Sequence, residues 1–239
     1  MRVYKSLFII IICLSAQLNI QAQVDSMYVD SIYNQDISFF HDSIIKDSNS
    51  IYFPTSIEAL FNNKDTSISH NQLIAYNVSW RKEPQNNPLE IDKQCIELLQ
   101  AIENKKFKKS IKIGRSILKV CPSNFTAHRE LALAYRKIGD YTNAKYHELI
   151  TIKLISAQMR FGNGSQERPF NMNNYAELMT YYEIVFRCKP DRAGFLKLKD
   201  GRILGALKCF SAGNNEIYIQ YCDMTHCSPW LKEGDYTEQ

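Results

Sequence analysis

Residues 92–158 carry an internal repeat with a period of about 34 residues, and this repeat constrains the fold more than any other feature of the chain. Apolar side chains that recur every three or four positions predict amphipathic helices on both sides of a turn at Gly139 and Asp140. Pro122 ends the first copy, and Ser123 or Asn124 is expected to cap the next helix. Four pairs of positions match between the copies: Leu98 with Ala132, Ala101 with Tyr135, Phe107 with Tyr141, and Ser110 with Ala144.

These helical pairs resemble the tetratricopeptide repeat, a helix-turn-helix unit of the same period. The second copy, ELALAYRKIGDYTNAKYHELI, matches that pattern well, whereas the first has Glu97 at a position that is usually apolar. We expect Tyr135 and Tyr141 to pack between the helices. Because two repeats are fewer than a free-standing solenoid needs, this unit must pack on neighbouring segments.

The first 22 residues have the composition of a cleavable secretory signal peptide. Arg2 and Lys5 precede the apolar run LFIIIICL, and small Ala22 stands just before Gln23, the expected mature N-terminus. This run is shorter than the roughly 20 residues that a membrane helix needs. Lipidation of Cys13 is the alternative, but Cys13 lies inside the apolar run. We expect export to the periplasm, the cell surface or the exterior of a Gram-negative bacterium, with no membrane span.

The charge of the exported chain argues against nucleic acid as a partner. Cleavage after residue 22 removes two of the 29 basic residues and none of the 25 acidic ones, which leaves a net charge of +2. That balance is too small to attract a polyanion through the field of the whole molecule.

Between the signal peptide and the repeat, the sequence predicts an arm and two short helices. Residues 23–50 form an acidic N-terminal arm with poor apolar periodicity. Thr55 with Glu58 and Ser69 with Gln72 fit the capping box that opens a helix. In the second of these helices three large side chains share one face: Leu73, Tyr76 and Trp80.

Residues 161–239 are expected to form a C-terminal α/β segment that packs on the helical region of residues 51–160. The turn-rich sequence FGNGSQERP joins the two, and Asn174 with Glu177 predicts a capped helix. Asp200-Gly201 is a strong hairpin signal, and alternating apolar residues on both sides predict an antiparallel meander of about three strands. The expected fold class is therefore α+β, with tetratricopeptide-like hairpins followed by a helix and a small meander.

The order of these pieces resembles domain-of-unknown-function family 4919, a family of exported proteins of Bacteroides-type bacteria. The likeness is carried by YFPTSIEALFNNKDTSISHNQLIAYNVSWRKEPQNNP, the helical pairs and FGNGSQERPFNMNNYAELMTYY, and it covers roughly residues 38–230. It departs between Pro190 and Leu198, where the family commonly has a Gly-rich, Cys-containing turn. The resemblance implies a fold and a compartment but no activity.

Reactive side chains crowd at one place, the cluster of Cys222, Asp223, His226 and Cys227. An oxidising compartment permits disulfides, and the candidate cysteines are Cys222, Cys227, Cys188 and Cys209. Free structural thiols, a zinc site and a Cys–His nucleophile are the alternatives. His147-Glu148 begins like the zinc-protease motif HExxH, but Thr151 replaces the second histidine, so a polar patch on a helix is the preferred interpretation.

No catalytic residue, cofactor or metal ligand is expected from these patterns. Helical-repeat pairs present a groove that suits peptides or partner proteins, so the sequence favours an interaction module that binds an envelope protein or peptide. The alternative is a small secreted hydrolase that uses the Cys222–Cys227 region.

Overall fold

The computed structural model of the protein describes residues 42–187, 190–210, 217–232 and 235–238. The predicted signal peptide and most of the acidic arm lie outside the described residues. The described chain begins with three helices, α3 (Asp42–Ile45), α4 (Pro54–Asn62) and α5 (His70–Lys82). Asp42 in α3 forms a local ion pair with Lys46 and a second ion pair with Lys82, which connects α3 to α5.

The two predicted capping boxes have different outcomes. At α5 the Ser69 side chain accepts from the Gln72 N–H, and the Gln72 side chain accepts from the Ser69 N–H, which confirms the prediction. At α4 the prediction is wrong, because the helix begins at Pro54 and its N-cap residue Phe53 makes no side-chain cap. Proline at the first helical position has no N–H that needs a partner, so α4 starts there.

Helix α5 is more deeply buried than an amphipathic surface helix. Leu73, Tyr76 and Trp80 are buried as predicted, and all the residues between them are buried as well. Packing on several sides explains this burial, because α4 and the long helix α9 (Tyr141–Phe161) both contact α5.

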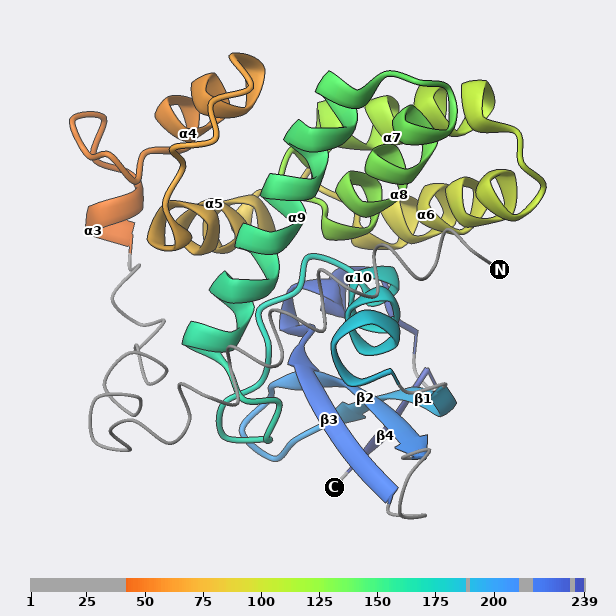
Figure 1. Cartoon of the computed structure of the whole chain (residues 1–239). Helices are drawn as coiled ribbons and strands as arrows, with labels where there is room; N and C mark the ends of the chain where they lie inside the picture. Colours follow the sequence, from red (N-terminus) through yellow and green to blue (C-terminus); the bar gives the residue numbers. More distant parts are fainter. Residues whose placement is uncertain (1–41, 188–189, 211–216, 233–234, 239) are drawn as a thin grey trace, which may run out of the picture. The chain divides into compact units, whose positions relative to one another are not determined.

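Helices α6 (Pro88–Glu103), α7 (Phe107–Val120), α8 (Phe125–Lys137) and α9 pack against one another in chain order (Figure 1). The turns after α6 and α8 are equivalent in the two copies of the repeat. Lys105 and Gly139 occupy matching positions and both adopt a positive φ, of 56° and 85°. The next residue in each turn donates its N–H to a carbonyl five residues back, at Ala101 and Tyr135.

Most of the paired repeat positions lie in the interior. Leu98, Ala101, Ser110, Ala132, Tyr135 and Ala144 are all buried. The prediction for Tyr141 is wrong, because its side chain is 70% exposed. Tyr141 is the first residue of α9, directly after the turn at Gly139 and Asp140, and not in the body of the hairpin.

The C-terminal segment contains helix α10 (Tyr175–Tyr181), a π-helical turn η2 (Tyr182–Phe186) and a four-stranded sheet. Strands β1 (Pro190–Lys197), β2 (Ile203–Phe210) and β3 (Ile217–Asp223) form the predicted antiparallel meander, and Asp200-Gly201 lies in its first turn. The short strand β4 (Tyr236–Glu238) was not predicted, and it pairs in parallel with β1. A 3-10 helix, η3 (Thr225–Trp230), follows β3. The described fold is therefore α+β and mostly helical.

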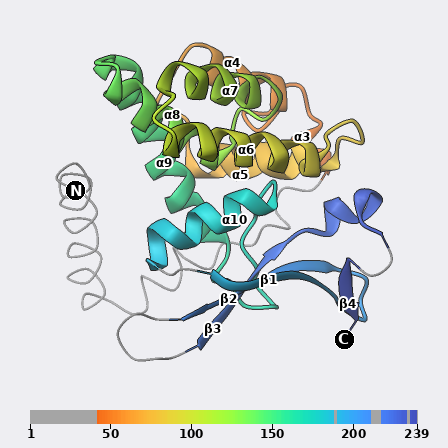
Figure 2. The ribbon, with the colours of Figure 1, turned by 90° about the vertical axis from the view of Figure 1, so that its right-hand side faces the viewer.

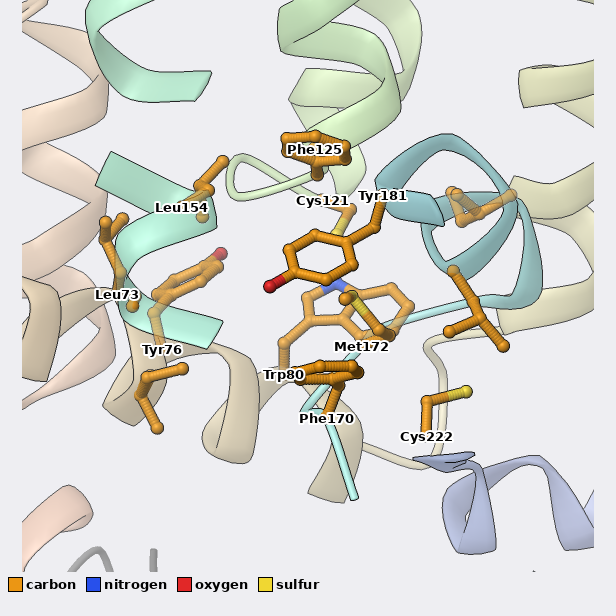
Figure 3. Close-up of a cluster of buried hydrophobic side chains, with 14 of the residues drawn as sticks. Leu73, Tyr76, Trp80, Cys121, Phe125, Leu154, Phe170, Met172, Tyr181 and Cys222 are labelled. Carbon is orange, nitrogen blue, oxygen red and sulfur yellow. The ribbon is translucent and has the colours of Figure 1, made fainter. Parts of the chain in front are cut away.

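One hydrophobic core runs through the helices and the sheet, and all described residues belong to a single compact unit, Asp36–Gln239. Figure 3 shows Trp80 from α5, Phe125 from α8, Tyr181 from α10 and Cys222 from β3 gathered in this core. Helix α10 lies between the helical hairpins and the sheet (Figures 1 and 2), where it contacts α6, α8 and β2. None of the helices in the described part of the chain is long and apolar enough to cross a bilayer.

Candidate functional site

The predicted reactive cluster lies where β3 meets η3, beside α5. Asp223 accepts hydrogen bonds from Arg81 Nη1 at 3.1 Å and from Thr225 Oγ1 at 2.7 Å. Although burial acts against it, the Arg81 charge and the Thr225 hydrogen bonds keep the pKa of Asp223 below its ordinary value. The Arg81 side chain is 9% exposed and the Asp223 side chain 32%, so this ion pair is partly removed from water.

His226 and Cys227 do not form a nucleophile–base pair. His226 Nε2 lies 2.9 Å from the carbonyl oxygen of Asn173, and a carbonyl only accepts, so Nε2 carries the proton. The Cys227 Sγ atom lies 3.7 Å from that same nitrogen, which therefore cannot take the thiol proton. Burial, with a contribution from Arg81, lowers the pKa of His226 to about 4. Burial also raises the pKa of the Cys227 thiol, so the thiolate is disfavoured.

The structure describes two of the four candidate disulfide residues in full. Cys222 and Cys227 are both free and both buried, and so are Cys95 and Cys121 in the helical region. Cys188 and the side chain of Cys209 lie outside the described residues. Within the described part of the chain, no group of three or more His, Cys, Asp or Glu side chains is placed to hold a metal ion.

Two carboxylates, those of the buried Glu177 and the half-buried Asp92, join the helical hairpins to the C-terminal segment. Glu177 of α10 accepts the Phe125 N–H, at the first turn of α8, and the Asn173 N–H, each at 2.7 Å. Asp92 of α6 accepts the Ala176 N–H at 2.7 Å, at the first turn of α10. Each carboxylate thus caps the N-terminus of a helix from another part of the chain, where the helix dipole favours negative charge.

Burial changes the acidity of both groups. It raises the pKa of Glu177 to about 7, against the effect of the two backbone donors, and the pKa of Asp92 to about 6. The predicted local cap is also present, because the Asn174 side chain accepts the Glu177 N–H at 3.0 Å. The long-range caps were missed, since no local sequence pattern links Asp92 to Ala176 or Phe125 to Glu177.

Side-chain amides complete this junction. Asn173 donates to Asn77 Oδ1 and to Ser123 Oγ, each at 3.2 Å. The Gln158 side chain pairs with the backbone of Asn171 in the manner of a β-bridge, accepting its N–H at 2.7 Å and donating to its carbonyl at 2.5 Å. The Gln158 bonds satisfy backbone groups of an irregular buried segment, and the Asn173 bonds join buried side chains, which are structural roles.

The incomplete zinc-protease motif is part of a buried histidine pair. His147 Nδ1 lies 3.0 Å from His128 Nδ1, and His128 Nε2 lies 2.8 Å from the Pro122 carbonyl oxygen. The carbonyl requires a proton on His128 Nε2, so His128 Nδ1 accepts and His147 Nδ1 donates. Burial lowers the pKa of His128 to about 4, and burial with the His128 charge lowers the pKa of His147 to about 2. Glu148, the other residue of the predicted polar patch, is half-buried and forms an ion pair with Arg136.

The largest group of exposed charges lies on α7 and the turn before it. Seven exposed cations occur between residues 105 and 119, with no acidic residue among them: Lys105, Lys106, Lys108, Lys109, Lys112, Arg115 and Lys119. Among the described residues, Lys109 alone of these forms an ion pair, with Glu97 of α6. This cationic face was missed because the small net charge of the chain conceals it, although the spacing of the lysines is visible in the sequence.

The chain matches no protein-family model, no curated protein and no solved structure. Its function is therefore inferred from its own residues.

Proposed function

We propose that this protein is an exported interaction module of the cell envelope whose tetratricopeptide-like hairpins bind a partner protein or peptide. The observation that carries this proposal is the contrast between its interior and its surface. Cys222 and Cys227 are buried, and the half-buried Asp223 and His226 are hydrogen-bonded to the fold, whereas exposed charge without ion-pair partners among the described residues is concentrated on α7.

The geometry also indicates which face of the hairpins is available. Helix α10 packs on α6 and α8, with hydrogen bonds that include Thr126 Oγ1 to Thr180 Oγ1 at 3.0 Å. Helix α10 therefore covers the face that α6 and α8 form, so a peptide cannot bind in a groove there. Helix α7 lies on the side of α6 and α8 away from α10 (Figures 1 and 2), and this outer side remains for a partner.

The hydrolase alternative requires an accessible nucleophile, and the 222–227 region offers a buried thiol beside an imidazole nitrogen that already carries a proton. Replacement of His226 and Cys227 distinguishes the two functions. We expect a variant that keeps its fold to retain partner binding. If the wild-type protein hydrolyses a substrate and a folded variant does not, the hydrolase function is established instead.

Partner recovery from the envelope fraction is the direct test. The mature chain, from Gln23 onward, is immobilised and exposed to a detergent extract of the envelope, and bound proteins are identified by mass spectrometry. Recovery of this protein in a reciprocal experiment, with the tagged partner as bait, supports the proposal. Failure to enrich any protein over a matched bait of equal charge contradicts it.

A further inference from the structure

The cations of α7 form a straight seam. Lys108, Lys112, Arg115 and Lys119 follow one another at intervals of four, three and four residues, so they lie along one face of α7, and Lys105 precedes them in the turn before the helix. All five side chains are exposed. At about 1.5 Å of rise per residue, the four cations on the helix span about 16 Å, with about 5 Å between successive charges.

The opposite face of α7 is buried against the neighbouring helices. Ser110, Gly114 and Ile117 are buried there, and α7 packs on α6 and α8. The approach to α8 is close, because a Cβ atom on Gly114 would lie 2.7 Å from the Leu131 side chain. Helix α7 therefore cannot turn its buried face outward to enter a membrane, and the cationic seam lies on the face that a partner can reach.

Without a bound partner, the cations of the seam destabilise helix α7. Like charges three or four residues apart repel one another on a helix surface. The first turn carries Lys108 and Lys109, where the helix dipole disfavours cations, and the N-cap residue Lys106 makes no side-chain cap. An anionic partner would relieve both effects at once.

We propose that the seam on α7 binds an acidic helix of the partner protein. This inference rests on the proposed function and names the chemistry of the partner. A helix with carboxylates at intervals of three and four residues repeats its charges at about 5 Å, in register with the seam. In an extended peptide, side chains on one face are two residues apart and therefore about 6.6 Å apart, which loses register over the length of the seam.

The types of cation favour a carboxylate partner over phosphate. Six of the seven exposed cations are lysines, which act as hydrated point charges, and only Arg115 offers the planar fork suited to bidentate phosphate binding. An acidic helix needs a line of such point charges and no bidentate geometry. We therefore place anionic vesicles and nucleic acid among the outcomes that would overturn the proposal.

The test uses two synthetic helical peptides of identical composition and charge. One carries Glu at intervals of three and four residues along a single face, and the other distributes the same Glu residues around the helix. We expect the first peptide to bind the mature protein at least tenfold more tightly at low salt, and both affinities to fall as salt screens the charges. Equal binding of the two peptides, or binding of neither, would overturn the proposal.

Matched charge-reversal variants locate the site. Lys108→Glu, Lys112→Glu and Arg115→Glu together should abolish binding of the single-face peptide. The variant should fold, because Lys108→Glu puts a carboxylate near the positive end of the helix dipole. The control combines Lys93→Glu, Lys145→Glu and Lys199→Glu, which are exposed and lie off the seam. Equal loss in the control, or tighter binding to anionic vesicles or to single-stranded DNA than to the peptide, would refute the proposal.

The same variants separate this inference from the proposed function. If the wild-type bait and the α7 variant recover the same envelope partner equally well, the interaction module stands and the seam is excluded as its binding surface. If the wild-type bait recovers no partner, the proposed function fails first.

Discussion

Among single residues, Glu177 has the acidity that most affects stability near neutral pH. Its folded pKa of about 7 lies above the ordinary value of 4.5, so the folded protein holds a proton here that the unfolded chain releases between these two pH values. The stability that this residue contributes therefore falls as pH rises from 4.5 to 7. The total change is about 3 kcal/mol, since one pKa unit is worth about 1.4 kcal/mol.

Glu177→Gln replaces the protonated carboxyl with a neutral group of similar shape. We expect the stability difference, wild type minus variant, to decrease as pH rises from 5 to 8, as measured by urea unfolding of both proteins. The depressed histidine pKa values at His128, His147 and His226 give the opposite pH dependence, with stability lost as pH falls below 6.5. They are common to both proteins, so they cancel in the difference. A difference that stays constant with pH would contradict the assignment.

The free thiols give a second prediction at this scale. With Cys188 and Cys209 changed to Ser, a protein that begins at Gln23 keeps Cys95, Cys121, Cys222 and Cys227, all free and buried in the structure. We expect a colourimetric thiol reagent to find almost no reactive cysteine in the native variant and four after unfolding without reductant. A count of two after unfolding would mean that a disulfide forms.

Residue roles were predictable where both partners lie within one turn of chain. The caps by Ser69, Asn124 and Asn174 could be predicted from sequence because each side chain lies three residues before the N–H that it accepts. The carboxylate caps by Asp92 and Glu177 span 84 and 52 residues, so they become visible only after the elements pack.

At the scale of elements, the turns after α6 and α8 have different residues at the matching left-handed position, Lys105 in the first turn and Gly139 in the second. Lys105 adopts a left-handed conformation that costs a residue with a Cβ atom about 1–2 kcal/mol, whereas Gly139 adopts it freely. We expect Gly139→Ala to destabilise the protein by about 1 kcal/mol, because a Cβ atom there meets nothing within 4 Å and only the backbone cost remains.

Lys105→Gly should have the opposite sign and stabilise the protein by up to about 1 kcal/mol, since the strain relieved exceeds the entropy that glycine adds to the unfolded chain. Thermal or urea unfolding of both variants measures these changes. Destabilisation by Lys105→Gly would show that the lysine side chain contributes contacts that outweigh its backbone strain.

Elements with a strong local period were predicted, and those without one were not. The Asp200-Gly201 hairpin and the capped helix α10 follow from turn chemistry and alternation. Strand β4 has three residues and pairs in parallel with β1, a contact made after a long connection, so no pattern of its own could reveal it. The α7 seam shows the reverse case, since its spacing is plain in the sequence but its exposure depends on which face α6 and α8 cover.

For the whole molecule, the question is whether the helical region and the C-terminal segment are separable. Several hydrogen bonds cross between them: the buried bonds join Phe125 with Glu177 and Gln158 with Asn171, and the part-buried bonds join Asp92 with Ala176 and Arg81 with Asp223. Separation would leave Glu177 and the α8 N–H groups without these partners, and it would expose Trp80, Phe125 and Tyr181 of the shared core. Buried polar groups that lose their partners cost about 1–3 kcal/mol each.

We therefore predict that the two parts fold as one cooperative body. Cutting the chain at the 161–168 joint should give fragments that aggregate or remain unfolded, while co-expression of residues 23–163 and 169–239 should restore a single thermal transition. The three-stranded meander has one apolar face and is marginal by itself, and the cost of uncovering that face is of the same order as the total stability of a domain. A dispersed amide NMR spectrum and a sharp thermal transition from residues 170–239 alone would contradict the prediction, because they would mean that the sheet and α10 complete their core without α6 and α8.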